Sequence, residues 1–110
     1  MMKQTYEKLL SDSSKAPEVV IFTATWCGPC KLLKPALQSL KADYGFNYTE
    51  LDIATFSPQE LTELGVRNVP TVQVLVNGAV KTQHVGAAMK SKMEYWLTDA
   101  GVISRGLSFE

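Results

Sequence analysis

The sequence predicts an α/β fold with a central mixed sheet of about four strands flanked by helices on both faces. The apolar, β-branched run at residues 19–24 is typical of a strand buried on both sides, and a helical pattern follows it. A strand–helix–strand unit forms a right-handed parallel crossover, which makes residues 47–53 the neighbouring strand. Asn77-Gly78 between two further strand patterns predicts an antiparallel hairpin. Parallel and antiparallel pairs together require a mixed sheet.

The first half of the chain alternates helix and strand patterns. Residues 3–10 predict a helix, which a polar connector follows. Its apolar face consists of three residues, Tyr6, Leu9 and Leu10. After Cys27 we expect a second helix, in which Pro29 suits the first turn and Pro35 causes a bend. Gly45 ends this helix before the second strand.

The second half predicts a short helix, the hairpin and a final helix. Residues 57–60 (Ser-Pro-Gln-Glu) combine an N-cap serine, a proline and a capping-box glutamate, and Gly65 stops the helix that they begin. The hairpin strands are residues 71–76 and 79–85. The final helix closes at Gly101 and is expected to pack through one face. Five residues form that face: Met89, Met93, Trp96, Leu97 and Ala100.

The length of 110 residues suits one domain with one hydrophobic core. We therefore expect a single domain over residues 1–110. An N-terminal helix and connector (1–17) precede the core (18–101). A tail (102–110) follows, which we expect to be partly disordered beyond about residue 103.

Composition excludes several function classes. Eleven basic and eleven acidic residues cancel, so the chain has no general attraction for nucleic acid or anionic lipid, although Lys31 and Lys34 could raise the potential near the cysteines. No run approaches the roughly 18 apolar residues that span a membrane, and residues 1–7 lack the apolar core of a secretory signal. We expect a cytoplasmic monomer that binds neither nucleic acid nor a membrane.

The only two cysteines of the chain are Cys27 and Cys30, with Gly28-Pro29 between them. They lie where the strand pattern changes to a helical one, so the N–H groups of a helix N-terminus should stabilise a thiolate and lower the pKa of Cys27. A bridge across three positions adds little stability, which favours a chemical or metal-binding role. Zinc normally needs four ligands, and the distant His84 is more typical of a structural or surface residue. We expect no metal.

The segment Trp26-Cys27-Gly28-Pro29-Cys30-Lys31 resembles the active site of the thioredoxin family. Further matches follow in order at compatible distances. They are Pro35, Val69-Pro70-Thr71, Asn77-Gly78 and Val85-Gly86-Ala87. The resemblance extends from about Val19 to Leu97, which is most of the chain.

This resemblance implies a thioredoxin-like fold and a protein-disulfide reductase that works by dithiol–disulfide exchange. The redox-active centre would be the Cys27–Cys30 disulfide, with no bound cofactor. Substrates would be disulfide-containing proteins, and an NADPH-dependent thioredoxin reductase would regenerate the dithiol. Such a protein takes part in electron transport and in cell redox homeostasis.

The resemblance also assigns roles to residues. Cys27 is the expected nucleophile and should be partly exposed, whereas Cys30 is the resolving thiol and should be more buried. Trp26 is expected to shield the pair and to bury most of its surface. The supporting residues are Trp26, Gly28, Pro29, Lys31 and Pro70. The substrate-binding residues are Trp26, Val69, Pro70 and Gly86, and the resemblance implies a cis Val69–Pro70 bond although trans is commoner in general.

The sequence departs from the family pattern at three positions. Ile21 stands where thioredoxins usually have a buried aspartate, and Thr23 stands where an aromatic residue is frequent. The usual partner lysine falls near Glu50. Isoleucine cannot accept the proton of Cys30, so water or another acid must do so. Glu50 and Asp52 are the candidates, and their alternative interpretation is as solvated strand residues.

Two other functions remain open at this point. A glutaredoxin-like enzyme would use glutathione as its reductant. A docking subunit would use the same face to bind a larger complex without catalysis. The same motif can also act as an oxidant in another compartment, so the direction of the reaction rests on the resemblance.

Overall fold

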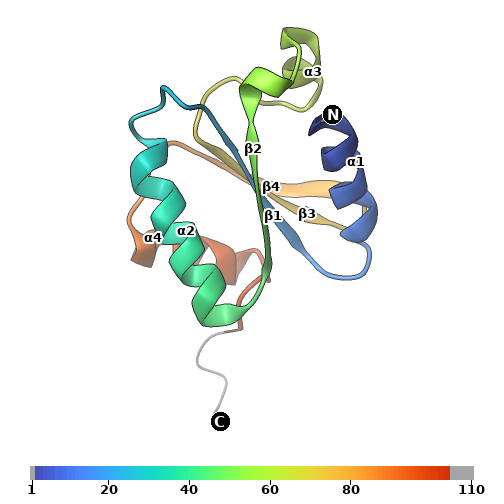
Figure 1. Cartoon of the computed structure of the whole chain (residues 1–110). Helices are drawn as coiled ribbons and strands as arrows, with labels where there is room; N and C mark the ends of the chain where they lie inside the picture. Colours follow the sequence, from blue (N-terminus) through green and yellow to red (C-terminus); the bar gives the residue numbers. More distant parts are fainter. Residues whose placement is uncertain (1, 105–110) are drawn as a thin grey trace.

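The computed structural model describes residues 2–104 and confirms the predicted α/β architecture (Figure 1). The helices, including one short 3₁₀ turn labelled η1, are α1 (Met2–Asp12), α2 (Cys30–Tyr44), η1 (Ile53–Thr55), α3 (Pro58–Glu63) and α4 (Lys90–Asp99). The strands are β1 (Glu18–Thr23), β2 (Asn47–Asp52), β3 (Thr71–Val76) and β4 (Ala79–Val85). Within the described residues no helix is long and apolar enough to span a bilayer.

The four strands form one mixed sheet in the order β2-β1-β3-β4. β1 and β2 are parallel and joined through α2, while β1–β3 and β3–β4 are antiparallel. The β3–β4 turn has positive φ at both central residues, 53° at Asn77 and 82° at Gly78. A type I′ hairpin turn requires that combination, which is why Asn-Gly predicted it.

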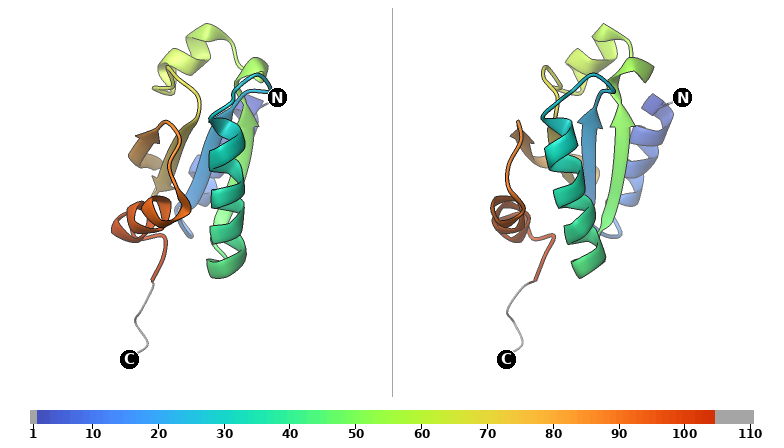
Figure 2. Two further views of the ribbon diagram at one scale, coloured as in Figure 1. Left: turned by 90° about the vertical axis from the view of Figure 1, so that its left-hand side faces the viewer. Right: turned by 60° about the vertical axis from the view of Figure 1, so that its left-hand side comes forward.

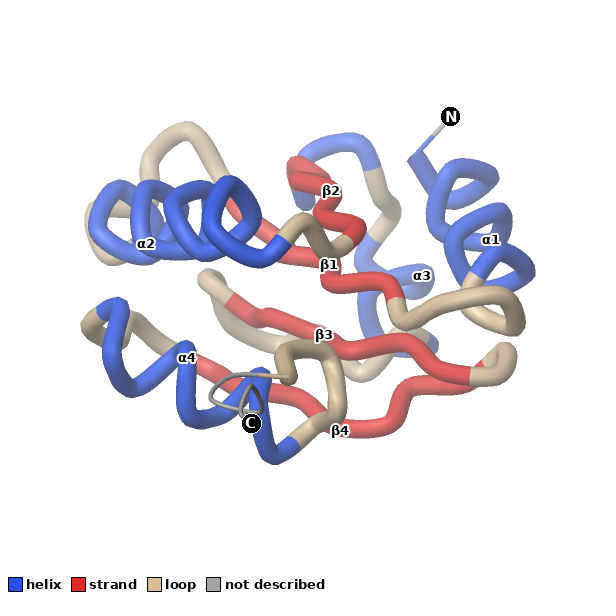
Figure 3. The backbone as a smooth tube through the Cα atoms, turned by 90° about the horizontal axis from the view of Figure 1, so that it is seen from below, coloured by secondary structure: helices blue, strands red, loops and turns tan. Residues whose placement is uncertain are grey.

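Helices cover both faces of the sheet. α2 and α4 lie on one face, and α1 and α3 lie on the other (Figures 2 and 3). β1 is buried along its whole length because its side chains alternate between the two cores. Val19 and Ile21 pack toward α2 and α4, whereas Val20 and Phe22 pack with residues of the α1 and α3 side.

Helix α2 begins later than the sequence predicted. It starts at Cys30, so Pro29 is its N-cap residue rather than a member of its first turn. Pro35 lies inside the helix, as expected. Gly45 ends it in the left-handed region with φ 77°, and its N–H donates to the Lys41 carbonyl. The late start leaves Cys27 in the loop that precedes the helix.

The end of the chain corrects one prediction. Met89 was expected in the core, but it is 79% exposed because it precedes α4 as the N-cap residue. Met93, Leu97 and Ala100 are buried as predicted. Ile103, at the start of the expected disorder, is buried in the same core. The rest of the predicted disordered tail, residues 105–110, lies outside the described residues.

A buried polar network links the layers, and nothing in the sequence predicted it. The Gln73 side chain on β3 is fully buried and accepts a hydrogen bond of 2.8 Å from the Tyr6 hydroxyl of α1. Its amide nitrogen donates to the Leu64 carbonyl at 3.0 Å and to the Gln83 side chain at 2.9 Å. The amide therefore ties α1, the end of α3 and the hairpin to one point.

Candidate active site

The two cysteines follow the carboxyl end of β1. Cys27 lies in the segment that connects β1 to α2, and Cys30 is the first residue of α2. Figure 1 shows the course of that segment. Cys27 and Cys30 pack with Ala24 in a small buried cluster, which Ile53 and Val69 cover from two other segments. The carboxyl ends of strands in open α/β sheets are the usual place for chemistry. The site therefore lies where the topology predicts it.

Cys27 and Cys30 form a disulfide with their Cα atoms 5.4 Å apart. Cys30 is 1% exposed and Cys27 is 3% exposed. The prediction that Cys30 is buried is confirmed, whereas the prediction of a partly exposed Cys27 is wrong for this oxidised form. The reason is the cover that Ala24, Ile53 and Val69 provide.

The sulfur of Cys27 takes the place of a side-chain cap at the start of α2. The backbone N–H of Cys30 donates to Cys27 Sγ at 3.1 Å, while the N-cap residue Pro29 makes no side-chain cap bond. The first N–H groups of a helix have no intrahelical acceptors, and together they form the positive end of the helix dipole. A sulfur in this position is stabilised as an anion. The geometry thus places a backbone donor where a Cys27 thiolate would form.

Trp26 differs from its prediction. Its side chain is 73% exposed, so it does not bury most of its surface. It stands at the rim of a hollow of about 230 Å³ beside the cysteines. The lining residues are Trp26, Ile53, Leu61, Val66, Arg67, Asn68 and Val69. An exposed indole beside this hollow presents apolar area to a partner molecule.

The other predicted site residues meet near the cysteines. The Val69–Pro70 peptide bond is cis, as the resemblance implied. Val69 packs against the cysteine cluster, and the Gly86 N–H donates to the Pro70 carbonyl at 2.9 Å. Gly86 has φ 96°, a backbone conformation that residues other than glycine rarely adopt. Three segments that are far apart in sequence are thus brought together around one disulfide.

Gly28, Pro29 and Lys31 are exposed beside the disulfide. The Lys31 N–H donates to the Gly28 carbonyl at 3.0 Å, which forms the turn that leads into α2. These three residues therefore lie on the surface that a substrate would approach.

A second hollow, of about 270 Å³, opens on the other side of the disulfide. Its lining residues are Thr23, Ala24, Thr25, Cys27, Cys30, Lys31, Lys34, Pro35 and Gln38. The Thr23 hydroxyl is buried there without a hydrogen-bond partner among the described residues. We call this space the Thr23 hollow. A large aromatic side chain in place of Thr23 would occupy more of this region.

Ile21 and Glu50 are direct partners in the β1–β2 register. Ile21 is fully buried among apolar side chains. Glu50 is half-buried and accepts hydrogen bonds from Gln38 at 2.7 Å and from the Tyr48 hydroxyl at 2.9 Å. Lys34 Nζ lies 3.7 Å from its other oxygen. Glu50 is therefore a partnered carboxylate beside the Thr23 hollow.

The spacing along α2 is the sequence signal for Gln38. Cys30, Lys34 and Gln38 are spaced by four residues, so they share one face of α2. Asp52 is the register partner of Thr23, and its Oδ1 accepts a hydrogen bond from the Ala54 N–H at 2.8 Å and caps η1. Glu50 contacts two α2 side chains that line the hollow, Lys34 and Gln38.

His84 is a structural residue, as expected. Its ring packs on Trp96 with 5.7 Å between ring centroids. Burial, and to a lesser degree the charge of Lys92, lower the pKa of His84. Across residues 2–104 no three His, Cys, Asp or Glu side chains are grouped as a metal site would need.

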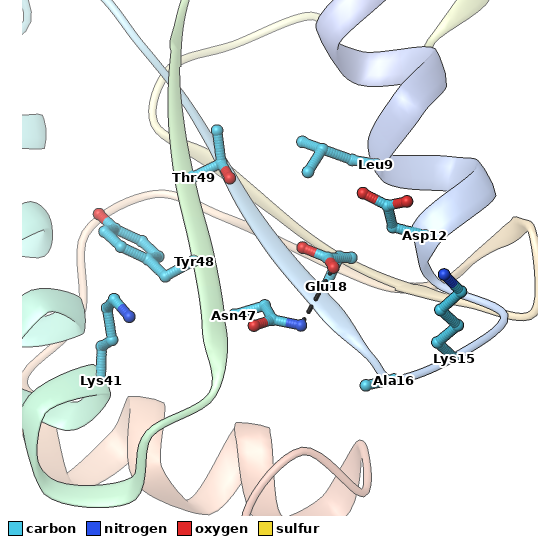
Figure 4. Close-up of a pocket in the computed structure, with 9 residues that line it drawn as sticks. All are labelled: Leu9, Asp12, Lys15, Ala16, Glu18, Lys41, Asn47, Tyr48 and Thr49. Carbon is cyan, nitrogen blue, oxygen red and sulfur yellow. Dashed lines mark hydrogen bonds between the residues drawn. The ribbon is translucent and has the colours of Figure 1, made fainter.

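A larger hollow, of about 500 Å³, lies at the amino end of β1 and β2 (Figure 4). Glu18 is buried at its base and accepts a hydrogen bond of 3.1 Å from Asn47. Burial, together with the nearby charge of Asp12, raises the pKa of Glu18. The hollow carries charges of both signs and no cysteine, so disulfide chemistry belongs at the other end of the sheet.

A disulfide between two cysteines at the N-terminus of a helix, bordered by a cis-proline loop, defines a thiol–disulfide oxidoreductase. The family model described as Thioredoxin matches residues 1–99. The chain belongs to the thioredoxin family. Its redox-active centre is the Cys27–Cys30 disulfide.

Relatives in bacteria, plastids and mitochondria support this assignment. A thioredoxin of Rhodospirillum rubrum is 37% identical over 82 residues, which cover 74% of this chain and 79% of the relative. A chloroplastic M-type thioredoxin of Zea mays is 35% identical over 72% of this chain, which spans 48% of that relative's length. The oxidised mitochondrial thioredoxin 3 of Saccharomyces cerevisiae matches with a TM-score of 0.75 and 28% identity, covering 88% of this chain and 89% of the other.

Proposed function

We propose that this thioredoxin-family protein works as a reductant of protein disulfides, with Cys27 as the attacking sulfur and Cys30 as the resolving sulfur. The observation that carries the proposal is the hydrogen bond from the Cys30 N–H to Cys27 Sγ. The same donor would stabilise the Cys27 thiolate after reduction. Cys30 is the buried first residue of α2, which suits a sulfur that reacts only within the protein.

The reaction proceeds in two exchanges. The Cys27 thiolate attacks one sulfur of the substrate disulfide, a mixed disulfide forms, and the other substrate sulfur leaves as a thiolate. Cys30 then loses its proton and attacks Cys27 Sγ, and the remaining substrate sulfur leaves. Two electrons pass from the dithiol to the substrate, and the Cys27–Cys30 disulfide is the product.

The surface around the cysteines suits an extended peptide. Trp26 presents an exposed indole and lines the same hollow as Val69, and the neighbouring Pro70 carbonyl accepts the Gly86 N–H. An extended segment can pair with the backbone of such a loop, with alternate side chains in flanking hollows. We assign substrate binding to these four residues.

The partners and the location follow from this chemistry. A dithiol that donates electrons needs a reducing compartment and a source of electrons, so we place the protein in the cytoplasm with an NADPH-dependent thioredoxin reductase. We propose a monomer without a bound cofactor, because the redox couple consists of its own two sulfurs. Cell fractionation, size-exclusion chromatography and assays with purified reductase test these proposals.

Reduction of insulin disulfides tests the function directly. We expect Cys27→Ser to abolish turnover, and Cys30→Ser to accumulate a covalent mixed disulfide at Cys27 that mass spectrometry detects. Turnover with glutathione as the sole reductant would indicate the glutaredoxin-like alternative. A cellular function that survives replacement of both cysteines by serine would indicate a docking subunit.

A further inference from the structure

The Thr23 hollow extends from the cysteines along α2 to two side chains that contact a carboxylate on β2. Cys30, Lys34 and Gln38 line it along one face of α2. Glu50 contacts the last two, since Gln38 Nε2 lies 2.7 Å from Oε2 and Lys34 Nζ lies 3.7 Å from Oε1. These helix positions are one and two turns from Cys30, about 6 Å and 12 Å along the axis.

The hollow is suited to hold water between Cys30 and Glu50. Its volume of about 270 Å³ is several times the roughly 30 Å³ that one water molecule occupies in the liquid. The buried Thr23 hydroxyl, which has no partner among the described residues, supplies a donor and an acceptor on the β1 side. Lys34 and Gln38 supply polar groups on the α2 side. Water in such a place finds the two to four partners that it needs.

We propose that Glu50 accepts, through water in the Thr23 hollow, the proton that Cys30 releases when it resolves the mixed disulfide. β1 offers no carboxyl at the register partner of Glu50, because Ile21 stands there. Asp52, the register partner of Thr23, accepts a hydrogen bond from the Ala54 N–H through one carboxylate oxygen and caps η1. Within the described part of the chain, no contact with Lys34 or Gln38 links it to α2 as Glu50 is linked. The inference rests on the proposed function, in which Cys30 is the resolving sulfur.

The step balances in atoms and electrons. The Cys30 S–H proton passes to water, and a water proton passes to Glu50. The Cys30 thiolate attacks Cys27 Sγ, the bond between Cys27 and the substrate sulfur breaks, and its electron pair leaves with that sulfur. Glu50 then returns the proton to solvent or to the departing thiolate.

The groups around Glu50 hold its carboxylate in place. Lys34 of α2 contributes a positive charge at 3.7 Å, and Lys31 adds a second cation at the rim of the hollow. On β2 the Tyr48 hydroxyl donates at 2.9 Å, and burial together with Glu50 raises the pKa of Tyr48, so it stays protonated. Asp52, two positions farther along β2, is the other carboxylate of that strand.

Single-turnover reduction of insulin by the pre-reduced full-length protein, followed by rapid acid quench, tests the proposal across pH. We expect Glu50→Gln to slow the conversion of mixed disulfide to the Cys27–Cys30 disulfide by about tenfold or more near neutral pH. The deficit should disappear in alkaline solution, where the Cys30 thiol ionises without help. Thr23→Val, which keeps the volume but removes the hydroxyl, should slow the same step.

Matched variants separate this role from others. Glu63→Gln removes an exposed carboxylate of α3 and should follow the wild-type pH profile. A merely structural Glu50 would change thermal stability but leave the pH profile of resolution unchanged. Equal profiles for Glu50→Gln and Glu63→Gln overturn the proposal. If Cys30→Ser traps no mixed disulfide at Cys27, the proposed function has failed instead.

Discussion

Placing an aspartate at position 21 would test how dry the core beside the active site is. Ile21 is fully buried between apolar side chains of α2 and β3, and its register partner is the carboxylate-bearing Glu50. A carboxyl in such a place has its pKa raised, because burial and a neighbouring negative charge both disfavour ionisation. Ile21→Asn is the matched control, since it introduces a polar side chain of similar size that cannot ionise.

The magnitude follows from linkage. Burial that raises the pKa of the introduced aspartate by about three units makes its ionisation unfavourable by about 4 kcal/mol. The free energy of unfolding of Ile21→Asp falls by that amount when the carboxyl is ionised. An acid whose folded-state pKa is raised loses stability as pH increases from its unfolded value toward its folded value. We therefore expect Ile21→Asp and Ile21→Asn to be similarly stable near about pH 4. Near about pH 8, Ile21→Asp should be less stable by about 4 kcal/mol.

Urea unfolding of both variants at several pH values measures this difference, and the titration of every other group cancels in the comparison. A difference that stays constant from acid to alkaline pH would show that residue 21 reaches water or a polar partner, which contradicts the burial described above. The same variants provide a functional comparison. If Glu50 accepts the Cys30 proton, the pH profile of disulfide reduction should be the same for Ile21→Asn as for the wild type.

Three further predictions concern stability. Tyr6→Phe leaves the buried Gln73 oxygen without its donor, so we expect a loss of about 1–2 kcal/mol in urea unfolding, and a double-mutant cycle with Gln73→Leu should show coupling. Ser57→Ala removes the capping box that Ser57 forms with Glu60 and should cost about 1 kcal/mol without slowing insulin reduction. Burial, reinforced by a nearby acidic side chain, raises the pKa of Glu18, so the wild type loses stability as pH rises above the ordinary carboxyl range. Glu18→Gln should remove that loss, and equal pH dependence of the two proteins in thermal unfolding would contradict it.

Much of the fold was predictable because its signals are local. Asn and Gly tolerate positive φ, and Asn77-Gly78 has positive φ at both positions. A two-residue hairpin turn needs this combination, so the dipeptide predicts the hairpin without any knowledge of tertiary contacts. The capping box at Ser57 and the apolar run of β1 acted over similarly short distances. The same holds for the cysteine pair, since a strand-to-helix transition places its sulfurs at a helix N-terminus whatever surrounds them.

The errors share a different cause. Cys27 is covered by Ile53 and Val69, which come from distant segments, while Trp26 and Met89 find no such cover and stay exposed. Whether a side chain is buried depends on which other segments the tertiary structure packs against it. The hydrophobic character of the side chain alone does not determine its burial.

The sequence by itself determined the chemistry of this protein. Two cysteines at the start of a helix are reactive because the N–H groups of that helix stabilise a thiolate. Only the tertiary structure decided how that chemistry is served. It placed the Gly86 N–H on the Pro70 carbonyl, and it joined Glu50 to Lys34 and Gln38 beside the Thr23 hollow. Spacing along the chain determines which residues share a face, whereas contacts between faces depend on the packing of the whole domain.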